Sequence, residues 1–589
     1  MWFRFAELRI RIASEKVGNM VKQGVIEKIA AATTEEFYTP IPKGYKPGKT
    51  KYVITTGSVI SGIGKGIFTS SLTKLFVDRG MKVAPIKLEA YLNVDAGTMN
   101  PYRHGEVFVL DDGLECDMDL GSYERFMDAN LTKESFVTSG QIYQSIIKKE
   151  RAGGYLGRDV QFIPHVTGEM KLVLRNLAMK TGADVVLVEI GGTVGDYENL
   201  FAFEAIRQLM YEEGEDNVCV INLTYILNPP SVGEFKSKAA QQGIKKMIEL
   251  GLQPDIIICR SEKKIPDKIK EKISLNVNVP VEHVFGGENV ESIYTLPLSL
   301  RKKGVDEAIL KILDCEKRFK KNGDSNLEKW TNANLVKNPK HKITIGIAGK
   351  YTGLIDSYIS ILKALEHCEA ATNSKIGVKW IETTDVEKGK KKPEQALKGI
   401  DGLIVPGGFG SRGSEGKIKC IKYAREKKIP YLGLCYGMQM AVIEFARNVC
   451  GLNGAHSTEC DTKSCDPVIC ILPEQDDIEG LGGTLRLGGH DVVVEKGTLA
   501  HSLYGSDRIR ERFRHRFNVN IKYIDALAEK GIIWSGRAPE KRIMQIMELP
   551  KSKHPFFLGT QFHPEFTSRP LKPNPLYLGF IRACVSGKK

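Results

Sequence analysis

Short apolar runs alternate with helix-length segments along most of the chain, and this alternation constrains the fold more than any other feature. In the first part the apolar runs are KYVITT (51–56), MKVAPIKLE (81–89), ADVVLVEIGG (183–192), NVCVINLTY (217–225) and DIIICR (255–260). Runs rich in Val and Ile between helical stretches predict βαβ units and a parallel sheet that is buried on both faces. Ligands of such sheets bind beyond the carboxyl ends of the strands.

A second series begins at HKITIGIAGKY (341–351) and continues through DGLIVPGGFG (401–410), IPYLGLCYG (429–437) and PFFLGTQFHPEF (555–566). The polar, aperiodic residues 316–340 between the two series predict an interdomain linker. With 589 residues the chain is also too long for one core. We therefore predict an α/β protein with two doubly wound, three-layer domains and mainly parallel sheets, at residues 51–315 and 341–586, after an extension at 1–50.

The composition excludes several classes of protein. The net charge is +14, but the lysines are dispersed and no zinc-finger or RNA-binding signature is present, so we expect no nucleic-acid partner. No run of 18 apolar residues occurs, so we expect no membrane span. The twelve cysteines include no C-x-x-C pair, which favours reduced thiols and a cytoplasmic location.

Two segments leave alternatives open. His456, Cys460, Cys465 and Cys470 are close in sequence, but they lack the short ligand pairs of structural zinc sites, so ordinary thiols are the favoured interpretation. The first 32 residues have helical periodicity and several Arg and Lys. They fit either a targeting peptide or an accessory surface helix, and their glutamates favour the helix. Residues 38–50 predict an irregular linker.

The stretch TTGSVISGIGKGI (55–67) is similar to a phosphate-binding loop but departs from it. The usual loop reads G-x-x-x-x-G-K-[ST], and its final hydroxyl ligates Mg²⁺. Here Gly66 follows Gly64 and Lys65, so that hydroxyl is missing, and Val59 stands where the first glycine is expected. The loop is either broken, a chance cluster of glycines, or a variant whose metal ligands lie elsewhere.

The segment GLCYG (433–437) has the form of a nucleophile elbow, because a strand runs into it and a helix leaves it. Cys435 would be the nucleophile, with its thiol activated at a helix N-terminus. The alternative for G-x-C-x-G alone is a buried core cysteine. QFHPEF supplies His563 as a base for Cys435 and Glu565 to orient it, both on one side of an extended segment. The glycines of PGGFG (406–410) can form an oxyanion hole.

These three motifs, in this order, resemble a class I glutamine amidotransferase domain over residues 341–586. The resemblance implies that Cys435 attacks the glutamine amide, forms a thioester and releases ammonia. It also implies that the glutamine is bound at Gly408, Tyr436, Gly437, Met438, Gln439, Glu459 and Arg516.

An ammonia source requires an activated acceptor, and two acidic segments could provide its metal site. LECDMDLGSYERF contains Asp117 and Asp119, and VVLVEIGGTVGDYEN ends an apolar strand at Glu189. Carboxylates at strand ends are suitable Mg²⁺ ligands and could replace the missing hydroxyl. Ordinary solvated acids are the alternative, which is favoured for either aspartate alone and evenly balanced for Glu189.

With these segments included, residues 51–586 resemble the CTP synthase family. The similarity rests on SGIGKGI, the long segment KLEAYLNVDAGTMNPYRHGEVFVLDDGLECDMDLGSYERF, VEIGGTVGDYEN, GEFKSK, LQPDIIICR and ESIY, and on the glutaminase motifs. It implies a P-loop-like amidoligase fold for the first domain. It implies that ATP phosphorylates O4 of UTP, that ammonia replaces the phosphate to give CTP, and that CTP inhibits while GTP activates. Homotetramers are typical of the family, and some members form filaments.

The resemblance also assigns positions. ATP would contact Ser61, Gly62, Ile63, Gly64, Lys65, Gly66, Lys87, Asp119, Glu288, Asn289 and Val290, and Asp119 with Glu189 would bind Mg²⁺. UTP or CTP would contact Ser61, Asp196, Tyr197, Glu198, Lys236, Ser237, Lys238, Gln241 and Lys272. GTP would lie near Phe409 and Arg486, and His104 would stand at the mouth of an ammonia tunnel.

One segment departs from the family, and two rival functions remain. GEFKSKAAQQG has Ala239 and Ala240 where the family has Pro and Thr, which predicts weaker UTP binding than in a chain restored to Pro and Thr. One rival is another ATP-dependent amidotransferase, as in cobyric acid synthesis; the GEFKSK lysines and the DMDLG segment favour UTP. The other is a polymerising protein without catalysis, which the complete set of catalytic residue types disfavours.

Overall fold

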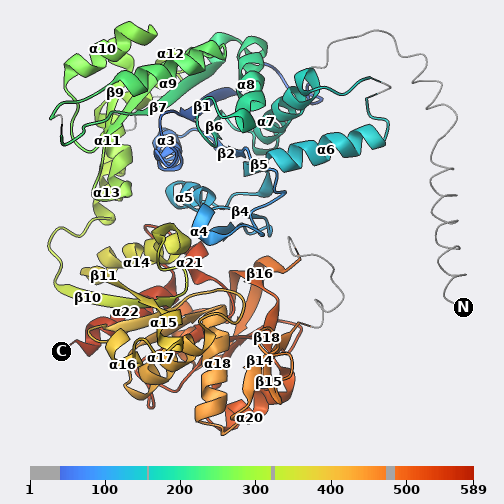
Figure 1. Cartoon of the computed structure of the whole chain (residues 1–589), viewed down its shortest axis with the longest axis vertical. Helices are drawn as coiled ribbons and strands as arrows, with labels where there is room; N and C mark the ends of the chain where they lie inside the picture. The colour runs from blue at the N-terminus through green and yellow to red at the C-terminus, as the bar shows by residue number, and fades with distance from the viewer. Residues whose placement is uncertain (1–39, 156–157, 232, 320–324, 473–483, 589) are drawn as a thin grey trace, which may run out of the picture.

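Each of the two strand–helix series forms one sheet with helices on both faces (Figure 1). The computed structural model describes residues 40–155, 158–231, 233–319, 325–472 and 484–588. The expected N-terminal helix lies outside these residues. Residues 40–50 are irregular, as expected, and they are attached to the first domain because the Tyr45 hydroxyl and the Gly48 amide each donate to Glu213, both at 2.9 Å.

The first sheet has seven parallel strands in the order β5-β2-β6-β1-β7-β8-β9. They are β1 Lys51–Gly57, β2 Val83–Glu89, β5 Phe136–Thr138, β6 Val185–Ile190, β7 Val218–Tyr225, β8 Ile256–Ser261 and β9 Val284–Glu288. The strands are buried on both faces, which explains why they are continuous apolar runs. Successive β1 residues join different cores: Tyr52 and Ile54 face one, Val53 the other.

Helices cover both faces of this sheet. A two-stranded hairpin forms a separate small sheet in the same domain. The helices are α3 Lys65–Asp78, α4 Pro101–His104, α5 Met118–Met127, α6 Ser139–Arg151, α7 Thr167–Thr181, α8 Leu200–Glu213, α9 Lys238–Glu249, α10 Asp267–Val277, α11 Leu296–Lys302 and α12 Val305–Ile312. The hairpin is β3 Val107–Val109 and β4 Glu115–Asp117. In Figure 1, α4, α5 and β4 lie between the two sheets.

The expected linker is not irregular throughout. Ser325–Ala333 forms helix α13, and its Leu327 and Trp330 are buried in the core of the first domain. Sequence reasoning missed this helix because only two apolar residues in the segment face the core. The stretch without helix or strand before the second sheet is residues 334–340.

The second sheet has nine strands in the order β11-β10-β12-β13-β21-β20-β19-β16-β17. Pairing is parallel from β11 to β21 and antiparallel from there to β17. The strands are β10 His341–Gly349, β11 Ser374–Glu382, β12 Gly402–Val405, β13 Tyr431–Leu434, β16 Arg486–Val494, β17 Arg508–His515, β19 Ile533–Arg537, β20 Met544–Glu548 and β21 Phe557–Thr560. The fold class predicted for both domains is confirmed.

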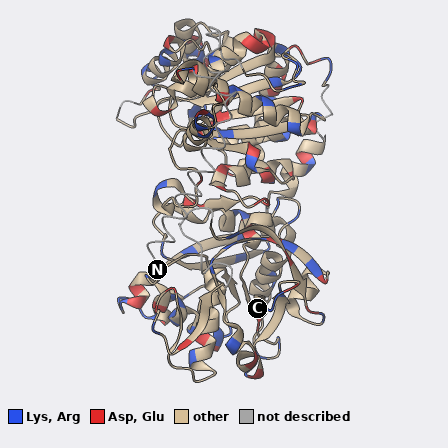
Figure 2. Cartoon of the chain, turned by 90° about the vertical axis from the view of Figure 1, so that its right-hand side faces the viewer, with Lys and Arg blue, Asp and Glu red and all other residues tan. Residues whose placement is uncertain are grey.

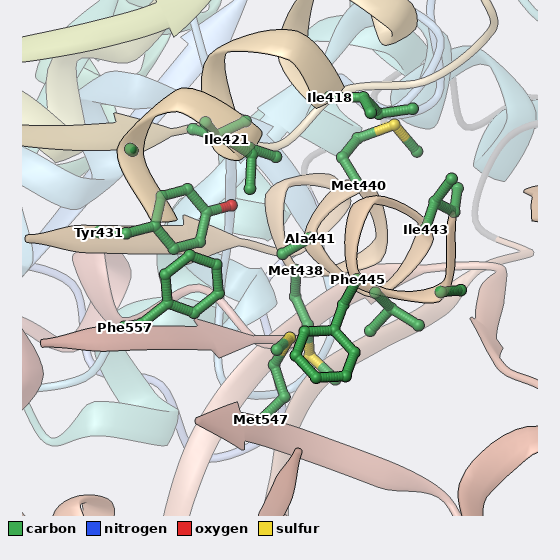
Figure 3. Packing of buried hydrophobic residues seen from close by; sticks show 14 of the residues in the cluster. Ile418, Ile421, Tyr431, Met438, Met440, Ala441, Ile443, Phe445, Met547 and Phe557 are labelled. Atoms are coloured by element: carbon green, nitrogen blue, oxygen red, sulfur yellow. The ribbon is translucent and has the colours of Figure 1, made fainter. Parts of the chain in front are cut away.

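Helices and a small sheet complete the second half. The helices are α14 Ile359–Thr372, α15 Thr383–Glu387, α16 Pro393–Ala396, α17 Ser414–Glu426, α18 Tyr436–Asn448, α19 Leu499–Tyr504, α20 Ile524–Glu529, α21 Pro564–Thr567 and α22 Pro575–Gly587. The small sheet contains β14 Ala455–Ser457, β15 Asp466–Ile471 and β18 Phe517–Val519. Figure 3 shows α18 packed on the sheet, where Tyr431 stacks on Phe557 with ring centroids 4.5 Å apart.

The structure also locates the charged residues and the cysteines of the chain. In the view of Figure 2, basic and acidic residues are interspersed over both halves. Among the described residues, none of the helices combines the length and the apolar character that crossing a membrane requires. All twelve cysteines lie in the described residues, and none forms a disulfide.

Candidate active sites

The predicted elbow is present and strained. Cys435 lies between β13 and α18 with φ 49° and ψ −100°, a conformation that costs about 1–3 kcal/mol for a residue with a side chain. The glycines on either side, Gly433 and Gly437, leave no room for a side chain. A Cβ at Gly433 would lie 2.5 Å from the Tyr431 hydroxyl, and one at Gly437 would lie 2.0 Å from the Val405 carbonyl oxygen. The backbone therefore presents Cys435 at the carboxyl end of the sheet.

His563 and Glu565 meet as predicted, although not in an extended segment. Pro564 begins the short helix α21, and His563 is its N-cap. His563 Nδ1 lies 2.7 Å from Glu565 Oε1. Burial lowers the pKa of His563, but Glu565 and Cys435 outweigh it and raise the pKa to about 10. His563 is thus an imidazolium at neutral pH, ready to protonate a leaving amine.

The glycine loop lies against both groups. A Cβ at Gly407 would lie 2.9 Å from His563 Cε1 and 3.8 Å from Cys435 Cβ. Two buried lysines that sequence reasoning missed donate hydrogen bonds to carbonyl groups of this loop. Lys350 Nζ donates to the Phe409 carbonyl, and Lys417 Nζ donates to the Pro406 carbonyl at 3.2 Å. Burial lowers the pKa of Lys417 to about 7.

A cavity of about 470 Å³ joins the two halves at this site. Its walls include the triad and residues of the first domain, and it is lined by Gly97, Thr98, Met99, Pro101, Glu106, Val107, Gly408, Phe409, Cys435, Glu459, Arg514, Arg516, His563 and Glu565, among others. The structure therefore brings Gly408, Glu459 and Arg516 together with Cys435. Glu106, a first-domain wall residue, was not predicted; burial raises its pKa to about 7.

The four predicted residues at the start of α18 contribute differently. The Met438 side chain is buried in a hydrophobic cluster (Figure 3) and is not among the residues that line the cavity. Gln439 Nε2 donates to the Phe517 carbonyl at 2.9 Å, and the Tyr436 hydroxyl donates to the Gly410 carbonyl at 2.9 Å. These side chains stabilise the surroundings of the site. The backbone amides of the first turn of α18 are the groups of Tyr436–Gln439 best placed to bind an anion.

Of the residues predicted for GTP and for the tunnel, Phe409 lines this cavity, and Arg486 and His104 are not among its lining residues. The Arg514 guanidinium lies 5.1 Å from the Phe409 ring centroid. Arg486 stacks on Phe513 at 5.3 Å and follows the lining residue Leu485 in the sequence. His104 ends α4 with its side chain exposed, and its ring packs edge-on against Tyr91. In the sequence it lies between the lining residues Pro101 and Glu106.

In the first domain, the structure explains the missing hydroxyl of the phosphate loop. A Cβ at Gly66 would lie 2.0 Å from Asp119 Oδ1, so a serine or threonine would fit there only if the Asp119 side chain or α3 moved. Asp119, at the start of α5, occupies the space that the usual hydroxyl would take. Gly62 and Gly64 have φ of 68° and 94°, which glycine adopts readily. A carboxylate thus lies where the usual hydroxyl would be. That the loop is a variant whose metal ligands lie elsewhere stays a prediction.

Four carboxylates surround one lysine at the carboxyl ends of β2, β4 and β6. Lys87 Nζ lies 3.0 Å from Glu89, 3.1 Å from Asp117 and 4.0 Å from Glu189, and it also contacts Asp119. Strand register explains part of this, because Lys87 pairs with Glu189 across β2 and β6. Burial raises the pKa of Asp117 and of Glu189 to about 7, although Lys87 opposes this. Glu89 was not predicted, although it lies two residues after Lys87 on the same strand.

Lys65 also lies in this cluster, at the start of α3. Its Nζ donates to the Gly192 carbonyl at 2.7 Å, and burial lowers its pKa. Within the described residues, no three His, Cys, Asp or Glu side chains are arranged as metal ligands, either here or around Cys460. Cys460 Sγ lies 3.3 Å from the Tyr436 hydroxyl, so the cysteine-rich segment packs beside the glutaminase site.

The predicted nucleotide positions lie at the same edge of the first sheet. Arg260 connects the phosphate loop to the adenine segment, because it donates to the Ile63 carbonyl at 3.2 Å and to Asn289 Oδ1 at 3.0 Å. Glu288 at the end of β9 pairs with Lys303, and Val290 packs against the core on that side. Arg260 was not predicted as a site residue.

The predicted UTP segment is mainly a helix rather than a loop. Helix α9 begins at Lys238, and Gln241 Nε2 donates to Ser237 Oγ at 3.0 Å. Ala240 is fully buried in a core cluster with Ile244, so a threonine there would place its hydroxyl among apolar groups. The remaining predicted positions are exposed: Ser61, Asp196, Tyr197, Glu198, Lys236, Lys238 and Lys272.

Comparison with known proteins agrees with this geometry. Residues 51–315 match the protein-family model described as CTP synthase N-terminus, and residues 353–583 match glutamine amidotransferase class-I. A CTP synthase of Caldanaerobacter subterraneus subsp. tengcongensis is 48% identical over 539 residues, which cover 91% of this chain and 99% of that protein. A CTP synthase of Pyrococcus furiosus is 48% identical over 542 residues, 92% and 99% respectively.

Among solved structures, the glutaminase domain of a Trypanosoma brucei CTPS with bound acivicin is 36% identical, with a TM-score of 0.39, and covers 41% of this chain and 94% of that one. The chain thus combines a class I glutamine amidotransferase domain with an ATP-dependent synthetase domain, which defines it as a glutamine-hydrolysing ligase. It belongs to the CTP synthase family.

Proposed function

We propose that this chain converts UTP to CTP with ATP and with ammonia released from L-glutamine. The observation that supports this best is the cavity that contains Cys435 and His563 and is also walled by residues 97–107 of the synthetase domain. Ammonia formed at Cys435 therefore emerges toward the domain that uses it. His104 would stand beside this exit.

The glutaminase residues have separate roles in the proposal. Cys435 Sγ attacks the amide carbon of glutamine, and the backbone N–H groups of the glycine loop stabilise the resulting oxyanion. His563 donates a proton to the departing ammonia as the C–N bond breaks, and Glu565 stabilises the imidazolium. Water then hydrolyses the thioester to glutamate. Gly408, Glu459 and Arg516 line the cavity and would hold the substrate, with the backbone of Tyr436–Gln439.

In the synthetase domain, Lys65, Lys87 and the N–H groups of residues 61–66 would bind the phosphates of ATP. Two ammonium groups face four carboxylates here, so the site has an excess of negative charge and of hard oxygen donors. These donors fit Mg²⁺, which Asp119 and Glu189 would hold. When bound, Mg²⁺ would neutralise phosphate charge during transfer to O4 of UTP.

We further propose the nucleotide positions. Glu288, Asn289 and Val290 would contact adenine. Ser61, Lys236, Ser237, Lys238, Gln241 and Lys272 would bind UTP, and Asp196, Tyr197 and Glu198 would contact CTP as inhibitor. GTP would activate the glutaminase from a position near Phe409 and Arg486. Three exposed lysines supply charge for a triphosphate, which supports the UTP assignment over a rival acceptor.

We propose a cytoplasmic homotetramer that could extend into filaments. Ile147, Phe162 and Ile163 are 61%, 63% and 52% exposed, and Tyr143 connects them because its ring contacts Phe162. Such an apolar patch fits an interface between subunits. The twelve cysteines, none of which forms a disulfide, fit a reducing compartment.

We propose domain limits of 51–315 and 341–586, with α13 packed on the first domain. Residues 1–50 are an extension, and deletion of residues 1–39 should leave catalysis intact, since residues 40–50 are hydrogen-bonded to the domain. An inactive but folded deletion variant would show that the extension belongs to the active assembly.

The test is CTP formation from UTP, ATP and Mg²⁺, measured in parallel with glutamine and with an ammonium salt. CTP from both sources is expected. CTP from ammonia alone would contradict the coupled glutaminase. Hydrolysis of glutamine without CTP from either source would indicate another acceptor. The absence of both activities would support a role without catalysis.

A further inference from the structure

Strand β17 carries arginine at four alternate positions, Arg508, Arg510, Arg512 and Arg514, so all four side chains leave the same face of the strand. Three of them form ion pairs with the first domain. Arg510 pairs with Asp111 at 2.9 Å, Arg512 with Glu124 at 2.8 Å and Arg514 with Glu115 at 2.7 Å. We call Arg510, Arg512 and Arg514 the arginine ladder.

In the Arg512–Glu124 pair both side chains are buried, and in the Arg514–Glu115 pair the carboxylate is buried and the arginine is partly exposed. We call these two the inner pairs. Glu124 is fully buried and accepts from Arg512 through both oxygens, from Arg569 at 2.9 Å and from the Leu131 amide at 2.9 Å. Arg514 also donates to the Gly97 carbonyl at 3.1 Å, at the cavity wall. Buried pairs are much more costly to break than exposed ones. The pair of Arg510 with Asp111 is more exposed.

The backbone of the same strand contacts the glutaminase triad. β17 is the last strand of its sheet, and its outer edge faces the segment that carries the catalytic histidine. The Arg512 carbonyl accepts a hydrogen bond from the His563 amide at 2.8 Å. The Arg514 carbonyl accepts one from Cys435 Sγ at 3.5 Å. Two of the three arginines whose side chains pair with the other domain, Arg512 and Arg514, are therefore the two whose carbonyls contact the catalytic histidine and the nucleophile.

The carboxylates of the ladder belong to elements of the synthetase site. Glu115 and Asp117 lie two apart on β4, and Asp119 and Glu124 lie on the ten-residue helix α5. Asp117 and Asp119 contact Lys87. One hairpin and one helix thus connect the acids of the synthetase site to the backbone beneath the triad, and both lie between the two sheets in Figure 1.

We propose that Glu124, Glu115, Arg512 and Arg514 are positioning residues that couple glutamine hydrolysis to the synthetase domain by setting the geometry of Cys435 and His563. This inference rests on the proposed two-site function. Arg514 also lines the cavity, but the role proposed for the inner pairs is to fix the strand edge against which both catalytic groups are held. Without the inner pairs, the triad would lose its alignment while the synthetase site keeps its own residues.

The test compares Glu124→Gln and Glu115→Gln with the matched control Asp491→Asn. Asp491 also pairs with β17 arginines, at 2.6 Å with Arg508, but within the glutaminase domain. The measurements are CTP formation with glutamine, CTP formation with ammonium, kcat and KM for glutamine hydrolysis, and the rate and pH profile of Cys435 alkylation by iodoacetamide, read by mass spectrometry of its peptide. Thermal unfolding shows which variants fold.

Both inner variants should lose about tenfold or more in kcat for glutamine hydrolysis and in Cys435 alkylation, since small misplacements are costly in catalysis. Ammonia-dependent CTP formation should stay within about twofold of wild type, as should every activity of Asp491→Asn. Equal loss with both nitrogen sources, or unchanged alkylation, would overturn the inference. If Glu124→Gln does not fold, Glu115→Gln decides. A wild-type chain without CTP formation would instead overturn the proposed function.

Discussion

The two candidate sites differ in how far the chain's own side chains balance their charge. In the glutaminase cavity the charged side chains are matched: His563 faces Glu565 at 2.7 Å, and Arg514 and Arg516 line the cavity together with Glu106 and Glu459. In the synthetase site two lysines face four carboxylates, and two of these acids have a pKa raised to about 7. The first fits glutamine, whose own ammonium and carboxylate groups balance. The second is built for ligands that bring their own charge, which fits a metal–nucleotide complex.

The largest expected effect separates the two sites completely. Cys435→Ala should lower glutamine-dependent CTP formation by roughly 10⁴-fold or more, as expected for a nucleophile. Ammonia-dependent formation should stay within about twofold, because the synthetase site keeps all its residues. Rates with each nitrogen source measure this, and Cys465→Ala, which removes an exposed thiol, is the control. Equal loss with both sources would contradict the two-site assignment.

Substitution of a carboxylate in the synthetase site should impair CTP formation with both nitrogen sources and leave glutamine hydrolysis intact. Glu189→Gln removes one proposed metal ligand and should lower CTP formation on the order of 10²-fold with either nitrogen source. Basal glutamine hydrolysis should persist, since Glu189 lies in the first sheet and its hydroxyl partner is Tyr123 of the same domain. Steady-state rates against Mg²⁺ concentration measure both. A fully active variant would show that Glu189 is not a ligand.

Restoring the ordinary phosphate loop should be harmful. Gly66→Ser creates the usual motif but places a Cβ within 2.0 Å of Asp119 Oδ1, so Asp119 or α3 must move. We expect a loss of roughly 10–100-fold with both nitrogen sources. Gly377→Ser, where a Cβ would meet only ordinary contacts at 3.7 Å, is the control. Wild-type activity of Gly66→Ser would show that the hydroxyl and the carboxylate can coexist.

A smaller effect concerns the UTP segment. Ala240→Thr buries a hydroxyl in an apolar cluster and should destabilise the protein by about 1–3 kcal/mol. Ala239→Pro falls in the first turn of α9, which tolerates proline, and so tests the expected gain in UTP affinity without that cost. Denaturant unfolding and UTP half-saturation measure the two effects. An unchanged half-saturation in Ala239→Pro would contradict the expected gain.

The features that could be predicted are those carried by neighbouring residues. The nine strands named from the sequence, the elbow and the glycine pattern of the phosphate loop each lie within a short segment, so period, glycine spacing and motif indicated them. The other strands of the two large sheets, among them β5, β9, β11 and the antiparallel strands, were not predicted. Lys350 and Lys417 could not be found this way, because they reach the glycine loop from separate elements. Glu89 had a local signal, its spacing from Lys87, whereas Arg260 and Glu124 act through partners more than a hundred residues away. α13 was missed because only two of its residues, Leu327 and Trp330, reach the core, which gives no periodic apolar pattern.

Buried histidines of the glutaminase domain have pKa values shifted in opposite directions. Together these shifts predict that the stability of the domain has a maximum between acid and alkaline pH. His515 and His554 are buried, which lowers their pKa to about 3 and about 4. The unfolded chain therefore binds more protons below pH ~6.5, and stability should fall as the pH falls. His563 has its pKa raised to about 10, so its contribution is present below pH ~6.5 and is lost as the pH rises toward 10.

Thermal unfolding from pH 4.5 to 10 measures the loss of stability at acid pH (the acid limb) and at alkaline pH (the alkaline limb). L-glutamine should raise the unfolding temperature of the glutaminase domain and so identifies its transition. Cys435→Ala should move the alkaline limb to lower pH, because Cys435 helps to raise the pKa of His563. It should leave the acid limb in place, since His515 and His554 owe their low pKa chiefly to burial. A displacement of both limbs together would mean that the thiol acts on stability by another route than the histidine charge.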